Sequence, residues 1–193
     1  MVEPGERDPD IARLLAALEA ALDVAAPEGT TACPAIATVL GRCRARVGKP
    51  ATGPGRAAPA TAFLAGALAL PRVQSRRPVA EAFAALAPRL RWKPKGRAED
   101  DQAPANTMLL GPDGVEERDD VWIGATVMAP GVAYPVHRHP PEEVYLPLTP
   151  GEWWNTDMDW RDPGEGVIHN PPGIHHAMRA GANPLLAIWL LPL

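Results

Sequence analysis

The chain has 193 residues, of which 46% are hydrophobic, and a formal net charge of −4 at pH 7. This length allows one sizeable core, or a barrel with a helical extension, and excludes two large domains. Proteins that bind nucleic acid by neutralising phosphates normally present a basic face, so nucleic acid is not an expected partner. No apolar stretch reaches the ~18 residues that cross a bilayer, so no membrane association is expected.

The first hundred residues predict α-helices. Asp8 and Pro9 form a helix cap and first-turn pair, and an apolar stripe at helical spacing follows them. Further helices are predicted at 34–47, 60–70 and 79–90. This half contains no histidine and is rich in alanine. We therefore interpret it as a packing element, or as an oligomerisation element that would suit a homodimer.

Two features of the helix predicted at 34–47 concern the binding partners of the protein and its location in the cell. The arginines at 42, 44 and 46 form a basic cluster, which we interpret as a solvated helix face. Cys33 and Cys43 lie on or near this helix, about 15 Å apart, which is too far for a disulfide. The N-terminal residues lack a signal-peptide pattern. We therefore expect reduced thiols and a cytoplasmic location.

After residue 92 the pattern changes. The segment 93–104 is charged and contains two prolines, as a linker does. Short β-prone runs follow, separated by turns; they lie at 106–111, 121–128, 143–148 and 185–191. Many short strands without intervening helices predict a sandwich or a small barrel. The expected protein is mainly β, with a helical region at 1–100 and a metal-binding β-barrel at 105–193.

All five histidines lie between residues 137 and 176, within the predicted barrel. His137 and His139 are two residues apart, so on a strand they share a face, and Glu143 can keep that face four residues later. Two imidazoles and a carboxylate suit a borderline divalent metal ion. His175 and His176 are neighbours that point to opposite faces, so only one of them can supply a fourth ligand.

These residues resemble the two motifs of the cupin family. The first motif, a glycine followed after five residues by His-x-His-x-x-x-Glu, is matched by Gly131, His137, His139 and Glu143. The second motif, Pro-x-Gly-x-x-His, is matched by Pro171, Gly173 and His176. The resemblance selects His176 over His175. It implies a small jelly-roll barrel in which three histidines and one glutamate bind one divalent ion, which is Zn, Fe, Mn or Ni.

The flanking residues carry a narrower resemblance. The pattern Tyr-Pro-x-His-x-His-x-x-x-Glu-x-Tyr runs from Tyr134 to Tyr145, behind a helical region of suitable length. It is similar to that of the cupin dimethylsulfoniopropionate (DMSP) lyases, which split this sulfonium zwitterion into dimethyl sulfide and acrylate. The resemblance implies a metal-dependent carbon–sulfur lyase acting on a small zwitterionic carboxylate.

The resemblance also implies roles for aromatic side chains. One tyrosine takes the α proton and the other ligates the metal or orients the substrate; we prefer Tyr145 as the base and Tyr134 as its partner. A phenol is mostly protonated at neutral pH, but a nearby cation stabilises the phenolate. Aromatic faces tolerate a sulfonium head. The tryptophans available for this are Trp122, Trp153, Trp154 and Trp189.

Two other classes of function share these ligands. Another metal cupin, such as an Fe(II) dioxygenase or an isomerase, would use the same four side chains. A non-catalytic ligand-binding or sensor cupin would give the helical half a regulatory role, but it would not explain why both tyrosines flank the motif.

Overall fold

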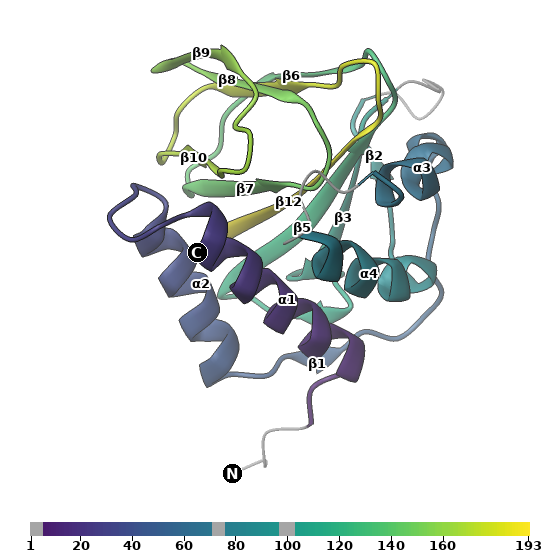
Figure 1. The fold of residues 1–193 in the computed structure, drawn as a ribbon. Helices are drawn as coiled ribbons and strands as arrows, with labels where there is room; N and C mark the ends of the chain where they lie inside the picture. The colour runs from purple at the N-terminus through teal and green to yellow at the C-terminus, as the bar shows by residue number, and fades with distance from the viewer. Residues whose placement is uncertain (1–5, 71–75, 97–102) are drawn as a thin grey trace.

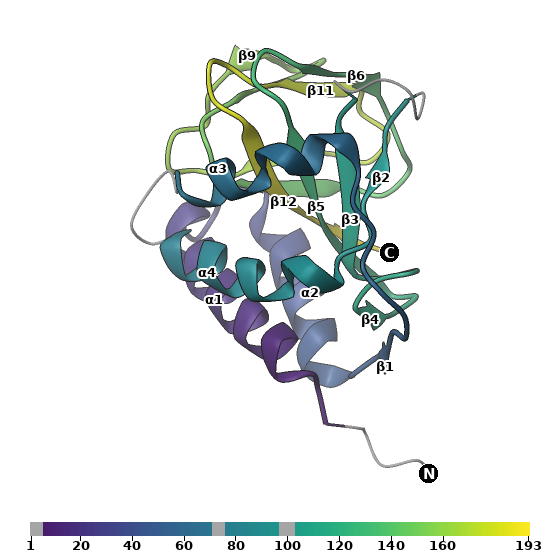
Figure 2. The same cartoon turned by 90° about the vertical axis from the view of Figure 1, so that its right-hand side faces the viewer.

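The computed structural model describes residues 6–70, 76–96 and 103–193, which form three layers (Figure 1). Helices cover one face of a large β-sheet, and a smaller sheet faces its other side. The view turned by 90° shows the same order of layers (Figure 2).

Helices form the first layer. α1 (Pro9–Ala25) begins at Asp8, whose side chain accepts hydrogen bonds from the backbone N–H groups of Asp10 and Ile11, as the predicted cap requires. The other helices are α2 (Cys33–Ala45), α3 (Leu64–Leu68) and α4 (Arg77–Leu86), with 3₁₀ turns η1 (Pro59–Phe63) and η3 (Ala87–Arg89). The helices predicted at 60–70 and 79–90 are therefore each divided between a 3₁₀ turn and an α-helix.

The strands form two sheets. The large sheet contains β1 (Lys49–Pro50), β2 (Lys93–Pro94), β3 (Ala105–Leu110), β4 (Glu116–Glu117), β5 (Val121–Met128), β7 (Glu143–Pro147), β10 (Ile168–Asn170) and β12 (Leu185–Pro192). Its order is β1-β4-β3-β5-β12-β7-β10, with β2 beside β3. The small sheet has the order β6-β11-β8-β9, formed by β6 (Ala133–His137), β11 (His176–Arg179), β8 (Glu152–Asn155) and β9 (Met158–Arg161). This is the expected mainly β, cupin-type fold preceded by helices.

The segment predicted as a linker, 93–104, is in part a strand. Lys93 of β2 pairs with Asn106 of β3, and Pro94 pairs with Ala105. Residues 97–102 of that prediction lie outside the described residues. The composition of the segment indicated a linker, but backbone pairing with β3 needs no apolar side chains, so composition could not reveal it.

Both faces of the large sheet are buried. On β12, Leu186, Ile188 and Leu190 pack in one core with the helices, whereas Leu185 and Trp189 pack in a second core between the two sheets. Successive side chains of a strand point to opposite faces, so a strand covered on both sides reads as a continuous apolar run. The helical layer therefore buries the outer face of the sheet whose inner face lines the barrel.

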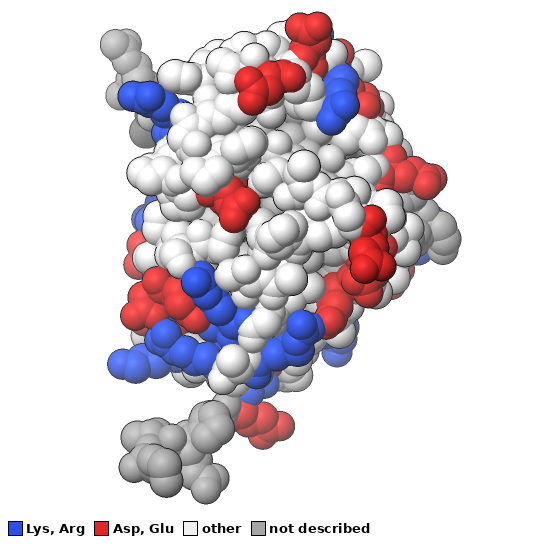
Figure 3. All heavy atoms as spheres, turned by 90° about the vertical axis from the view of Figure 1, so that its left-hand side faces the viewer, with Lys and Arg blue, Asp and Glu red and all other residues white. Residues whose placement is uncertain are grey.

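The basic cluster at 42–46 is paired within the fold. Arg44 Nη1 lies 2.5 Å from Glu19 Oε1, and Arg46 Nη1 lies 2.6 Å from Asp119 Oδ1. In Figure 3, Lys and Arg gather toward the bottom of the face shown, with Asp and Glu beside them. Opposite charges thus accompany Arg44 and Arg46, whereas Arg42 donates hydrogen bonds to the backbone carbonyl oxygens of Asp120 and Leu193. Cys33 and Cys43, both on α2, are unpaired as expected. Among the described helices, none combines the length and the apolar character that crossing a bilayer would need.

A buried arginine ties the helical layer to the barrel. Arg76 directly precedes α4 and is 1% exposed. Its guanidinium donates hydrogen bonds to the carbonyl oxygens of Pro147, Glu165 and Gly166, the last two at 2.6 and 2.9 Å. The planar guanidinium has five donors, which suits several carbonyls at once. Arg76 thereby fixes the end of β7 and the loop before β10 against the helices.

Replacing Arg76 with methionine, which has similar length, should lower the free energy of unfolding by at least about 3 kcal/mol, because buried carbonyls lose their donors. Urea denaturation followed by circular dichroism measures this loss. Arg13→Met is the matched control. The Arg13 guanidinium lies 3.4 Å from Asp10 Oδ1 and is largely exposed, so its removal should change stability by less than about 0.5 kcal/mol. Equal losses in the two variants would contradict the assigned role of Arg76.

Candidate metal centre

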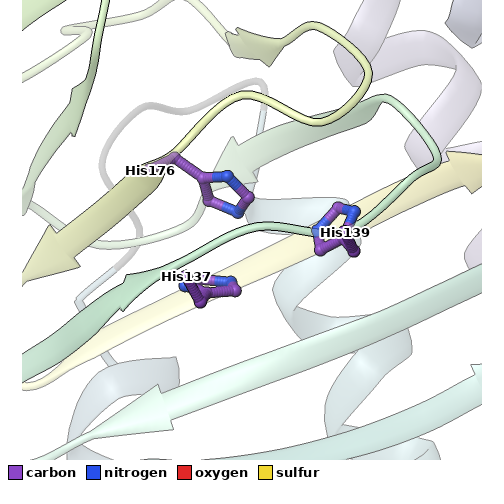
Figure 4. A group of neighbouring side chains, drawn as sticks. All are labelled: His137, His139 and His176. Atoms are coloured by element: carbon purple, nitrogen blue, oxygen red, sulfur yellow. The ribbon is translucent and has the colours of Figure 1, made fainter.

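Three imidazoles converge between the two sheets (Figure 4). His137 ends β6, His139 follows it in the loop before β7, and His176 begins β11. One ring nitrogen from each lies within 4.8 Å of the other two. Because β6 and β11 pair with His176 opposite His137, the strand register brings the second sequence motif to the first. His175 is exposed and His176 is buried, so these neighbours do point to opposite faces.

Backbone carbonyls orient each of the three rings. In every ring Nδ1 lies near a carbonyl oxygen two residues away: His137 to Pro135 at 3.0 Å, His139 to Pro141 at 2.9 Å and His176 to Ile174 at 3.0 Å. A carbonyl oxygen can only accept, so Nδ1 carries the hydrogen and Nε2 of the neutral ring presents a lone pair. Metal-binding histidines are oriented in this way by their second nitrogen.

Glu143 supplies the buried carboxylate of this site. It begins β7 and is 4% exposed. Its Oε2 lies 3.1 Å from His176 Nε2 and 3.4 Å from His139 Nε2. Within the described part of the chain, neither Glu143 Oε2 nor His176 Nε2 has a hydrogen-bond partner. Two buried acceptors that face each other are costly unless a cation lies between them. The donor set therefore fits a divalent metal ion.

The spacing is slightly wider than a bound ion would require. Two nitrogens that are each ~2.1 Å from one ion lie at most ~4.2 Å apart. The observed limit of 4.8 Å exceeds this by about 0.6 Å, so the imidazoles lie slightly farther apart than they would around a bound ion.

Two of the four groups, Glu143 and His137, have the charges that metal binding requires, whereas contact with Glu143 raises the pKa of His139. Burial disfavours a charged carboxylate, but contact with His139 and His176 lowers the pKa of Glu143 to about 2. Burial lowers the pKa of His137 to about 4, and His176 adds to this effect. At neutral pH Glu143 is therefore ionised and His137 is neutral, which are the protonation states in which these groups bind metals.

A cavity of about 190 Å³ adjoins these ligands. His137, His139 and Glu143 line it, together with both predicted tyrosines, Tyr134 and Tyr145. Drug-sized ligands occupy about 300–1,000 Å³, so this cavity suits a smaller molecule.

The two tyrosines are buried and lie on different sheets. The Tyr134 ring centroid is 4.8 Å from that of His137, and the Tyr145 centroid is 6.5 Å from that of His176. Burial raises the pKa of Tyr134, and a hydrogen bond from Asn106 opposes that rise. Burial raises the pKa of Tyr145 well above its ordinary value, and the negative charge of Glu143 adds to it. A cation near Glu143 would act against the second effect.

The candidate tryptophans divide into two groups. Trp122 and Trp189 line the cavity, whereas Trp153 and Trp154 are not among its lining residues. Trp153 is buried and lies beside Tyr145, with ring centroids 6.2 Å apart. Trp154 lies beside Trp160, at 6.5 Å. Trp122 and Trp189, and neither member of the adjacent pair, are therefore lining residues of this cavity.

Sequence reasoning missed three polar residues that line the cavity, namely Lys95, Asn106 and Thr126. Asn106 and Thr126 are polar positions within predicted strands and face each other across β3 and β5. A polar residue on an otherwise apolar strand was the available signal. Lys95 falls in the segment predicted as a linker, where a lysine carries no such signal.

Sequence comparisons relate this chain to one enzyme family. The family model for dimethylsulfoniopropionate lyase matches residues 35–187. The putative DMSP lyase DddL of Cereibacter sphaeroides is 32% identical over 130 residues, which cover 64% of this chain and 54% of that protein. The chain thus spans about half the length of this curated relative.

Solved structures show the same fold. The DMSP lyase DddQ from Ruegeria pomeroyi DSS-3 superposes with a TM-score of 0.73 at 23% identity, covering 96% of this chain and 92% of that one. A structure reported with the DMSP lyases RdDddP and RnDddQII gives a TM-score of 0.70 at 19% identity, covering 95% and 92%. The family match extends over most of the sequence and includes the four candidate ligands and both tyrosines. This chain belongs to the dimethylsulfoniopropionate lyase family.

Proposed function

We propose that this protein is a metal-dependent carbon–sulfur lyase that cleaves DMSP to dimethyl sulfide and acrylate. One observation carries the proposal: a single small cavity is lined by metal-ligand side chains and by two phenol groups. Membership of the DMSP lyase family supports this choice over other reactions of metal cupins.

His137, His139, Glu143 and His176 would bind one divalent ion, and Zn, Fe, Mn and Ni are all compatible with this donor set. When bound, such an ion supplies Lewis acidity that stabilises negative charge on the substrate carboxylate. The orphaned acceptors Glu143 Oε2 and His176 Nε2 support this assignment.

We assign the base to Tyr145, whose phenolate a bound cation would stabilise against the rise in pKa that burial and the charge of Glu143 cause. The Tyr145 oxygen takes the proton from the carbon next to the substrate carboxylate, and the electron pair of that C–H bond becomes the second bond of the new C=C. The bond between the β carbon and sulfur breaks, and its electron pair leaves with sulfur as neutral dimethyl sulfide. Acrylate and the protonated phenol remain, so atoms and charges balance.

Other cavity residues match the two ends of the zwitterion. Lys95 presents an ammonium group for which the described residues offer no hydrogen bond or ion pair. It lies close enough to the ligands to lower the pKa of His139 against the dominant rise caused by Glu143. The substrate carboxylate is its complement. Trp122 and Trp189 offer aromatic faces to the sulfonium head, worth about 0.5–2 kcal/mol each.

Removing a metal ligand should remove both metal and activity. His176→Ala should lose the bound metal and at least a hundredfold in dimethyl sulfide release, because the remaining ligands no longer enclose the ion. Elemental analysis and headspace gas chromatography measure the two quantities. His175→Ala is the matched control, since this exposed neighbour faces away and its loss should change neither. Full metal content in His176→Ala would rule out the assigned ligand set.

Removing the base should stop turnover and leave the metal bound. Tyr145→Phe should lower kcat about 10²–10⁴-fold, the range expected for a general base, with metal content unchanged. Tyr134→Phe should lower kcat less. Wild-type turnover under argon separates the lyase from an oxygen-consuming dioxygenase. If both phenylalanine variants kept full activity, the mechanism would be wrong.

Lys95→Met should raise KM for DMSP about tenfold with a smaller change in kcat, because the carboxylate is already charged in the bound substrate and most of this ion pair forms before the transition state. Steady-state kinetics measure the split. Lys93→Met is the control two residues away, since its ammonium is exposed and paired with Asp113 at 2.8 Å. A rise in KM of the same size in both variants would count against a specific role for Lys95.

A further inference from the structure

A hydrogen-bond chain crosses the cavity wall and ends at Tyr134. Trp189 Nε1 lies 3.2 Å from Thr126 Oγ1, Thr126 Oγ1 lies 2.7 Å from Asn106 Oδ1, and Asn106 Nδ2 lies 2.9 Å from Tyr134 Oη. All four residues line the cavity that contains the metal ligands. The chain uses none of the ligands themselves.

The donor and acceptor roles along this hydrogen-bond chain follow from Trp189, its first member. An indole N–H can only donate, so Thr126 Oγ1 accepts from Trp189 and donates its own hydrogen to Asn106 Oδ1. With its oxygen engaged, the Asn106 amide turns its N–H₂ group toward Tyr134. The Tyr134 oxygen therefore accepts, and the hydrogen of its hydroxyl remains available for a different acceptor.

Strand pairing places these residues side by side. Asn106 on β3 is opposite Thr126 on β5, and Thr126 is opposite Ala187 on β12, two residues from Trp189. Gly124 gives the indole its space, because a Cβ at that position would lie 2.2 Å from two atoms of the Trp189 ring. The missing side chain thus lets Trp189 lie across β5 and reach Thr126.

We propose that this chain holds the Tyr134 hydroxyl as a hydrogen-bond donor aimed at the substrate carboxylate. The inference rests on the proposed function, in which negative charge grows on that carboxylate as the α proton leaves. Donors fixed in place before the reaction stabilise such charge in the transition state, and each hydrogen bond in a chain polarises the next. Trp189, Thr126 and Asn106 are then positioning residues that act through Tyr134.

The kinetic consequence differs from that expected for Lys95. Charge that develops only in the transition state affects kcat, whereas an interaction present throughout affects KM. Asn106→Leu removes the donor to Tyr134 without adding charge and should lower kcat at least tenfold, with a smaller rise in KM because the carboxylate is already charged in the bound substrate. Thr126→Val removes one hydroxyl at constant shape and should lower kcat threefold or more, whereas Thr126→Ser should recover it.

A double variant tests whether Asn106 acts through Tyr134. Asn106→Leu combined with Tyr134→Phe should be no slower than Tyr134→Phe alone, because the chain then has no end group to position. Metal content and circular dichroism of each variant check that the site and fold are intact. Multiplied losses in the double variant, or an unchanged kcat in Asn106→Leu, would overturn the inference.

A second measurement needs no turnover. The indole proton of Trp189, assigned in ¹⁵N spectra with Trp189→Phe, should exchange with solvent at least tenfold faster in Thr126→Val than in Thr126→Ser. Equal exchange rates in these two variants would contradict the hydrogen-bond chain itself. A wild-type protein that releases no dimethyl sulfide, yet shows the expected difference in exchange, would overturn the proposed function and leave the chain in place.

Discussion

A buried carboxylate that faces the lone pairs of imidazoles is the constraint on which the rest of the site depends. Glu143 Oε2 and His176 Nε2 approach to 3.1 Å, and the other nitrogen of His176 is committed to a backbone carbonyl. Such an arrangement is unfavourable in a dry interior unless positive charge compensates it. The fold must therefore resist separation of these acceptors, and rigid strands on both sheets provide that resistance.

The two-sided burial of the large sheet explains how one element serves both stability and chemistry. On β7, Val144 and Leu146 face the helices, while Glu143 and Tyr145 face the space between the sheets. Alternation along the strand keeps the two sets apart. The helices thus support the site without lining the cavity, because they cover the apolar side of strands whose other side carries the candidate ligand Glu143 and Tyr145.

Local sequence spacing predicted the longer helices and strands and the shared face of His137, His139 and Glu143, since these depend on short-range geometry. The cap at Asp8 and the apolar run of β12 are examples. The choice of His176, in contrast, came from the family resemblance. The choice between Trp153 and Trp189 as a cavity residue could not be predicted, because it depends on which strands pair and on the space above Gly124. Asn106 was missed for the same reason, since its partners lie on other strands.

The carbonyl oxygens that accept hydrogen bonds from Arg76 limit the positions at which the chain could be truncated. Helix residues such as Phe83 share one apolar core with strand residues such as Ile188, so the border near residue 100 separates sequence types and not two independent cores. A fragment that starts at β3 would lack both Arg76 and the helices. It would therefore expose these carbonyl oxygens and the apolar face of the large sheet to water. Shortening the protein to its barrel, or grafting the barrel onto another chain, would first require redesign of the entire sheet face that the helices cover.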